Sequence, residues 1–172
     1  MILPVKYYGD PVLRQKAQEI KIINDEIKEL SNNLMETMQA ENGLGLAAPQ
    51  VGISLQAIAI DTSEERDNPY VLLNPEITYS SKEMATMEEG CLSFPDIYGK
   101  IMRHEEITVE GLKIDGQYVK LHLKGIESRA IQHEFDHLQG VLFIDKMSAS
   151  HKIVLKGKLK KLKKATQANL TN

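Results

Sequence analysis

The amino-acid sequence predicts an α+β fold, with antiparallel β-sheets packed around a central helix. Short apolar or β-branched stretches bounded by turn residues occupy the middle of the chain, as is typical of antiparallel strands. Around them lie segments whose apolar residues recur every three or four positions, which is the period of an α-helix. We therefore expect an N-terminal helix, antiparallel strands, the central helix and a C-terminal amphipathic helix.

The first predicted helix begins after Asn24, whose side chain can cap a helix N-terminus. Apolar residues lie on one face, and the dipeptide Asn42-Gly43 is a typical helix stop. The following segment, 43–52, contains three glycines, one proline and a single strongly polar side chain, Gln50. We expect it to be a loop that lies against the rest of the protein. The core-facing residues of the helix are Ile27, Leu30, Leu34 and Met38.

Four short segments have the apolar or β-branched composition of strands and end in turn residues. The last two flank Asp115-Gly116, a dipeptide favoured in tight turns, so they should form a hairpin. The central helix is expected after them, over 126–139, with Gly140 as its stop and a short buried connection, 141–144, beyond it. The predicted strands are 56–61, 70–73, 105–112 and 118–123.

The last part of the chain, 148–172, is predicted to be a basic amphipathic helix. Gly157 should weaken this helix, and its end should fray. From residue 151 onward there are seven lysines and no acidic residue. Because the whole chain has a net charge of −3, residues 1–150 carry −10. The lysines form either a solvated face or a surface that binds phosphates. The apolar stripe of this helix consists of Leu155, Leu159 and Leu162.

The length and composition of the chain are those of one globular domain. A chain of 172 residues can bury a single core, so we expect one domain over residues 1–172. Its 42% hydrophobic and 26% charged residues exclude a disordered or fibrous protein. No signal peptide or membrane span is apparent, so we expect a cytoplasmic protein. The single cysteine, Cys91, cannot form an internal disulfide and needs another explanation.

The run 132–138 contains the pattern HExxH. On a helix, His133 and His137 lie one above the other, about 6 Å apart along the axis, where both can bind one divalent ion. Glu134 then lies beside that ion, where a carboxylate can accept a proton from water. The pattern is typical of hydrolytic zinc enzymes, but it supplies only two protein ligands.

A third ligand must come from elsewhere in the chain. In metzincin-type proteases a third histidine follows the motif, but the corresponding residue here is Phe143. The only acid after His137 is Asp145, near the end of the folded part. The ligand should therefore lie upstream, where Cys91 is the only thiol, in a predicted Glu-Glu-Gly-Cys turn. A Cys/His/His set leaves one coordination position for water, as in catalytic sites.

Three segments together resemble the signature motifs of the peptide deformylase family, in the family's order and at its usual separations. They are 43–50, 89–93 and 132–138. The resemblance covers nearly the whole chain. It implies an enzyme that removes the formyl group from the N-terminal formyl-methionine of newly made proteins.

The resemblance also implies the roles of single residues. Glu134 would accept a proton from the attacking water and return it to the leaving amine. The side-chain amide of Gln50 and the backbone N–H of Leu92 would stabilise the charge that develops on the formyl oxygen. One divalent metal ion would be bound by Cys91, His133 and His137.

Substrate binding is implied at the glycine-rich loop. Gly45 lets the backbone approach a peptide and hydrogen-bond it like an added strand. The methionine side chain requires an apolar pocket beside the metal, and Glu89 is expected to be structural rather than in contact with substrate. The predicted substrate-binding residues are Gly43, Leu44, Gly45, Met87, Glu89 and Ala130.

The ligand set suits Zn²⁺, Fe²⁺, Co²⁺ and Ni²⁺, and the resemblance implies Fe²⁺ as the physiological ion. In some bacterial members of the family the C-terminal helix contacts the ribosome, which the lysine-rich segment 148–172 would suit. The expected partners are nascent formyl-methionyl peptides, with no membrane and no specific DNA.

Two other functions remain open at this point. A metallopeptidase could use the same three ligands to cut ordinary peptide bonds, although Gln50 and the glycine loop favour a deformylase. A non-catalytic, metal-stabilised module could bind RNA or the ribosome through its basic tail, although Glu134 and Gln50 argue against it. Asp136, inside the motif, could orient a ligand histidine, face solvent or have a structural role.

Overall fold

The predicted α+β class is confirmed by a computed structural model that describes residues 1–172. Three α-helices, seven strands and three short 3₁₀ helices follow one another along the chain. The α-helices are α1 (Asp25–Ala40), α2 (Gly125–Leu138) and α3 (Ala149–Leu170). The 3₁₀ helices are η1 (Pro11–Arg14), η2 (Ala48–Val51) and η3 (Phe143–Lys146). The strands are β1 (Gly45–Ala47), β2 (Ala57–Ile60), β3 (Tyr70–Ser80), β4 (Met84–Cys91), β5 (Phe94–His104), β6 (Glu106–Leu112) and β7 (Tyr118–Lys124).

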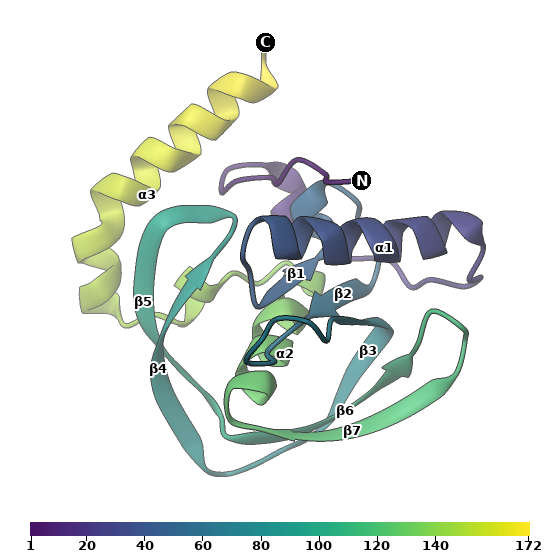
Figure 1. The fold of residues 1–172 in the computed structure, drawn as a ribbon. Helices are drawn as coiled ribbons and strands as arrows, with labels where there is room; N and C mark the ends of the chain where they lie inside the picture. The colour runs from purple at the N-terminus through teal and green to yellow at the C-terminus, as the bar shows by residue number, and fades with distance from the viewer.

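All strand pairs are antiparallel and belong to two sheets. Five strands form one sheet in the order β1-β2-β3-β6-β7, and β4 and β5 form a separate hairpin. Figure 1 shows α2 in the middle of the molecule, with α1 above it and the long strands β3, β6 and β7 below. Helix α2 contacts strands of both sheets, so it is the element around which the sheets pack.

The N-terminal helix forms as its sequence predicts. The side chain of Asn24 accepts a hydrogen bond from the backbone N–H of Ile27, which caps the first turn. The four predicted core residues are buried. Helix α1 ends at Ala40, and Asn42 has a left-handed backbone with φ of 56°. The face that α1 buries lies against β2 and against β1, which belongs to the glycine-rich segment.

Three strands, β1, β4 and β5, were not predicted, and a fourth, β3, is longer than expected. Strand β4 is mostly exposed and lacks an apolar alternation, while β5 alternates but contains Pro95 and Gly99. Strand β3 continues past Leu73 through a register shift, and its second half is largely exposed. Such strands leave little hydrophobic pattern in a sequence. The glycine-rich segment, expected to be a loop, forms the short strand β1 and the 3₁₀ helix η2.

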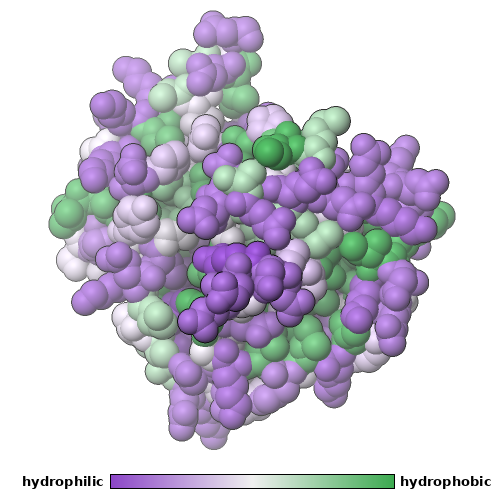
Figure 2. Space-filling view, in the orientation of Figure 1, coloured by the Kyte–Doolittle hydropathy of each residue, from purple (hydrophilic) through white to green (hydrophobic).

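The hydrophobic core has three parts. One lies between α1 and the sheet, and the second lies between the sheet and α2, where Ile131 and Leu138 are fully buried. The third joins β5 to η3 and the start of α3 through Phe94, Phe143 and Leu155. On the face in Figure 2, hydrophilic residues predominate over the hydrophobic ones.

Helix α3 lies on the outside of the molecule, as Figure 1 shows. The side chain of Ser148 caps its first turn, and the helix runs through Gly157 without a break to Leu170. The expected fraying is therefore not seen in this structure. Leu155 is buried, and Leu159 and Leu162 pack partly against the same core. None of the helices is both long and apolar enough to span a membrane.

Candidate metal and catalytic site

Helix α2 carries three buried polar side chains of the HExxH run on the side that faces the sheets. The rings of His133 and His137 lie 5.2 Å apart between their centres and meet edge to face, as a spacing of four on a helix requires. Glu134 lies between them in the chain and is also buried. The packing of α2 inside the molecule thus keeps these side chains away from bulk water.

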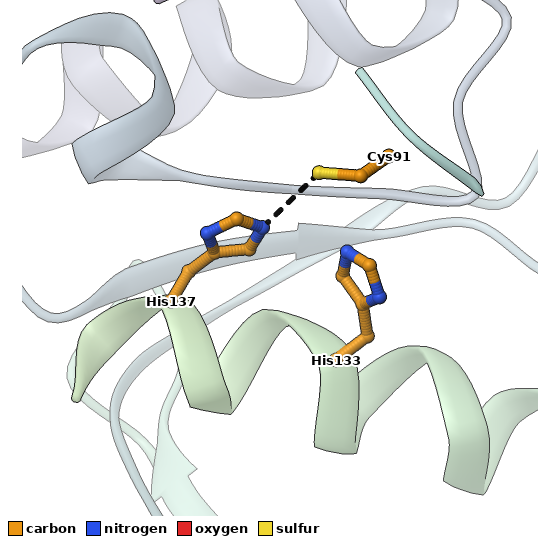
Figure 3. Close-up of side chains that lie close together, drawn as sticks. All are labelled: Cys91, His133 and His137. Carbon is orange, nitrogen blue, oxygen red and sulfur yellow. Dashed lines mark hydrogen bonds between the residues drawn. The ribbon is translucent and has the colours of Figure 1, made fainter. Parts of the chain in front are cut away.

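Cys91 reaches this helix from the β4–β5 hairpin. Its Sγ lies 3.4 Å from Nε2 of His137, the contact that Figure 3 marks with a dashed line. One ligand atom from each of Cys91, His133 and His137 can be chosen so that all three lie within 4.8 Å of one another. Cys91 was expected in a turn, but it is the last residue of β4, and the turn is formed by Leu92 and Ser93. The hairpin is thus what brings the thiol to the helix.

A carboxylate holds one of the histidines. Oε1 of Glu89 lies 2.8 Å from Nδ1 of His133, which leaves Nε2 of that ring free to bind a metal. Arg103 and Arg129 donate to the same carboxylate from opposite elements, β5 and α2. Burial alone would raise the pKa of Glu89, but the hydrogen bonds with His133 and Arg103 lower it to about 2. Glu89 is therefore an ionised, fixed support for His133.

Arg103 links this support to the motif a second time. Its Nη1 donates to Oδ2 of Asp136 at 2.9 Å, and Lys146 lies 3.2 Å from the same oxygen. Asp136 thus neither faces solvent freely nor contacts a ligand histidine. Arg103 and Arg129 were not predicted as site residues, although the position of Arg103 in the sequence indicates a buried charge. Every second residue of this part of β5 is buried, including Ile97, Ile101 and Arg103. A charged residue at such a position indicates that it has a partner of opposite charge inside the protein.

Gln50 lies on the other side of the cysteine. The 3₁₀ helix η2 follows β1 directly, so the backbone N–H of Ala47 donates to Oε1 of Gln50 at 2.9 Å. This bond fixes the amide so that Nε2 points to Ser93 Oγ at 3.2 Å and to Cys91 Sγ at 3.5 Å. The side-chain N–H₂ group of Gln50 is therefore oriented toward the Cys91 thiol.

Glu134 has one oxygen without a partner. Oε2 is buried and makes no hydrogen bond within the protein. The side chain lies directly against Gly45, where a Cβ atom would come within 2.7 Å of Cγ and Oε1 of Glu134. Burial raises the pKa of Glu134 to about 7, with His133 and Arg103 opposing the shift and Glu89 adding to it. A carboxyl group with this pKa can accept and return a proton near neutral pH.

A cavity of about 560 Å³ opens onto these groups. Met87, which was predicted to bind substrate, does not line it; this residue of β4 is 47% exposed. Gln50 and His137 lie behind the lining. Other lining residues were not predicted, because they reach the cavity from β5, α2 and two further parts of the chain without forming a local motif. They include Tyr7, Asn42, Phe94, Tyr98, Ile126 and Arg129. The predicted residues that do line it are Gly43, Leu44, Gly45, Glu89, Cys91, Leu92, Ala130, His133 and Glu134.

The buried donor atoms fit a borderline divalent metal. A thiol and two imidazoles form a set typical of catalytic zinc or iron sites. Burial lowers the pKa of His137 well below its usual value, which keeps this imidazole neutral. A neutral imidazole is the form that binds a metal. The free oxygen of Glu134 beside the donor atoms is the second feature that a hydrolytic metal site requires.

Three side chains that can hold a metal, a buried carboxyl group and an adjoining cavity are together typical of hydrolytic enzymes. The chain belongs to the polypeptide deformylase family, whose model matches residues 2–153. Members of this family are enzymes that hydrolyse an N-formyl amide, and the chain is such an enzyme.

Both sequences and solved structures support this membership. The peptide deformylase of Thermodesulfovibrio yellowstonii is 44% identical over 161 residues, covering 92% of this chain and 97% of that protein. The peptide deformylase of Desulforudis audaxviator is 41% identical over 151 residues, covering 88% and 97%. A plant peptide deformylase superposes with a TM-score of 0.94 at 32% identity, covering 99% of this chain and 94% of that one. The enzyme of Thermotoga maritima superposes with a TM-score of 0.82 at 41% identity, covering 86% and 99%.

Proposed function

We propose that this protein is one catalytic domain that removes the formyl group from the N-terminal formyl-methionine of nascent polypeptides and releases formate. The observation that carries the proposal is the cluster of Cys91, His133 and His137 at the inner end of the cavity, with the unpartnered oxygen of Glu134 beside it. The family membership supplies the reaction.

Proton transfer is assigned to Glu134. A divalent ion held by Cys91, His133 and His137 would supply an acidified water and polarise the formyl oxygen. Oε2 of Glu134 has no other partner, so it can accept the proton of the water that attacks the formyl carbon. The carboxyl group then donates this proton to the amine as the C–N bond breaks. The fixed pairing between Glu89 and His133 leaves Glu134 as the free base of the site.

Two donors are assigned to the formyl oxygen. The amide of Gln50 is held by Ala47 and directed at Cys91, and Leu92 follows Cys91 in the chain. The side-chain N–H₂ of Gln50 and the backbone N–H of Leu92 would donate to the oxygen as its charge develops. Because both are held by short turns, they need little rearrangement in the transition state.

The peptide is assigned to the open edge of β1. This strand lies at one end of the five-stranded sheet, and Gly43, Leu44 and Gly45 line the cavity. An extended peptide can pair with this edge as an added strand. Ala130 and the stem of Glu89 would border the methionine side chain, beside the metal ligands.

We propose Fe²⁺ as the physiological ion, with Zn²⁺, Ni²⁺ or Co²⁺ able to replace it after purification. Fe²⁺ and its thiolate ligand are both sensitive to oxygen. Protein purified without air should contain about one iron per chain and lose activity on exposure to air. Metal content and formate release measured on the same samples test this assignment.

The reaction is tested with a matched pair of peptides. The protein should release formate from formyl-Met-Ala-Ser and leave Met-Ala-Ser intact. Cleavage of a peptide bond in either peptide would instead indicate a metallopeptidase. Absence of formate release with metal bound would indicate a non-catalytic module.

A further inference from the structure

The wall of the cavity formed by residues 43–45 is held from behind by one side chain. Nη1 of Arg66 donates to the carbonyl oxygen of Gly43 at 2.9 Å and to that of Asp61 at 3.1 Å. Gly43 lies just before β1, and Asp61 directly follows β2. Arg66 therefore ties the start of the wall to the end of the neighbouring strand.

The loop that carries Arg66 is itself fixed. Oδ1 of Asp61 accepts hydrogen bonds from the backbone N–H and the hydroxyl of Ser63, and the N–H of Arg66 donates to the carbonyl of Ser63. The backbone of Arg66 has φ of 57°, a left-handed conformation that a side chain-bearing residue adopts when its surroundings hold it. The guanidinium group is thus presented to Gly43 by a rigid turn.

Backbone hydrogen bonds from Gly43 to Met38 and from Asp61 to Leu44 also hold the wall, but Arg66 provides its side-chain support on this side. A polar cavity of about 120 Å³ lies behind it, lined by Gln39, Asn42, Gly43, Asp61 and Arg66. No apolar side chain lines this cavity, so hydrophobic packing cannot replace the hydrogen bonds of Arg66. On its other side, Gly43 lies against Leu92, where a Cβ atom would come within 3.0 Å of Cδ1. The position of Gly43 thus depends on its backbone bond to Met38, on Arg66 and on the hairpin turn.

Gly43 would contact the bound peptide beyond its reacting, formylated end. Gly45 touches Glu134 and so marks the position of the formyl group. Gly43 lies two residues away along the same edge, a distance of about 6–7 Å in an extended chain. A peptide paired with this edge therefore passes Gly43 with the residues that follow methionine.

We propose that Arg66 is a positioning residue, which holds the wall at Gly43 so that it binds the peptide backbone after the formyl-methionine. This inference rests on the proposed function. Arg66 contacts neither the metal ligands nor Glu134, so it acts on substrate binding through Gly43 and the Asp61 strand end.

Two substrates of different length test the assignment. In Arg66→Ala, KM for formyl-Met-Ala-Ser should rise about tenfold, because a charged hydrogen-bond donor to the wall is lost. KM for formyl-methionine amide, which ends after methionine, should change less than about twofold. Arg66→Lys keeps one charged donor and should give an intermediate KM for the longer peptide. An equal change for both substrates, or none for either, would overturn the proposal.

Hydrogen exchange provides a readout that does not depend on activity. The N–H of Asp61 donates to the carbonyl of Leu44 at 2.9 Å. Its exchange rate therefore reports whether residues 43–45 remain hydrogen-bonded to the end of β2. This N–H should exchange faster in Arg66→Ala and remain protected in the control Glu65→Ala, since Glu65 is an exposed residue of the same loop without a hydrogen bond or ion pair. An unchanged exchange rate of the Asp61 N–H in Arg66→Ala would refute the proposed role of Arg66. If the unaltered protein released no formate from either substrate, the proposed function would fail, while the exchange rates would still test Arg66.

Discussion

Gly45 leaves no room for a side chain next to Glu134. A Cβ atom at this position would lie 2.7 Å from the carboxylate, closer than real contacts allow. Gly45→Ala should therefore displace the Glu134 side chain and lower kcat by about 100-fold, while the metal ligands keep their positions. Formate release and metal content should be measured together.

A second glycine provides the control for this substitution. Gly157 lies in α3 with nothing within 4 Å of its Cβ position. Gly157→Ala should leave kcat unchanged and stabilise the helix by about 0.5–1 kcal/mol. If Gly45→Ala were as active as Gly157→Ala, the close contact between Gly45 and Glu134 would not be needed for catalysis.

The carboxylate of Glu134 can be removed without changing its shape. Glu134→Gln has nearly the same volume but cannot accept a proton, so turnover should fall by about 10²–10⁴-fold. Bound metal should stay near one ion per chain, because Glu134 is not one of the proposed ligands. Normal turnover in this variant would exclude Glu134 as the base, whereas loss of metal would show that it has a structural role.

Among the elements, β4, β5 and α2 are joined by one buried network of charges. Arg103 is only 1% exposed and bonds both Glu89 and Asp136. Arg103→Met removes the charge and keeps the bulk, so it should destabilise the protein by about 3–5 kcal/mol, since two carboxylates lose a partner inside the protein. Urea unfolding followed by circular dichroism measures this change.

An exposed ion pair gives the comparison. Arg14 and Asp145 also form a bidentate pair, but their side chains are 45% and 36% exposed. Arg14→Met should cost about 1 kcal/mol or less, because water screens this pair. Similar losses of stability in Arg14→Met and Arg103→Met would mean that burial does not increase the contribution of the charge network to stability.

The elements also show what could be predicted from the sequence. Helix α1 and the hairpin β6–β7 have strong periodicity, a cap or a turn dipeptide, and the structure contains them within a few residues of the predicted bounds. The β4–β5 hairpin was missed because its stability comes from contacts distant in sequence, such as those of Arg103 with Glu89 and Asp136. At the site, local motifs identified nine of the twenty residues that line the cavity. Tyr7 and Tyr98 also line the cavity, but neither belongs to a sequence motif that could have predicted this.

At the scale of the whole molecule, charge is separated between the body and α3. Residues 151–172 contain seven lysines and no acid, although the chain as a whole has a net charge of −3. Leu155 and Thr166 face the body and are buried, whereas the lysines lie on the exposed sides of the helix. Figure 1 shows α3 on the outside of the molecule, so the exposed lysines on its outer side can meet a large partner. We propose that this surface contacts ribosomal RNA and brings the enzyme to emerging chains.

Three of these lysines provide a direct test. Lys156, Lys160 and Lys164 are exposed and follow one another at spacings of four, so they share one side of α3. Replacing all three with glutamate should reduce co-sedimentation with ribosomes by about tenfold or more at physiological salt, because phosphate contacts dominate such binding. Replacement with arginine keeps the charge and should preserve co-sedimentation. Both variants should release formate from free peptides at the normal rate, since Leu155 and the core below it are untouched. Equal co-sedimentation of the glutamate and arginine variants would show that the charge on α3 does not bind the ribosome.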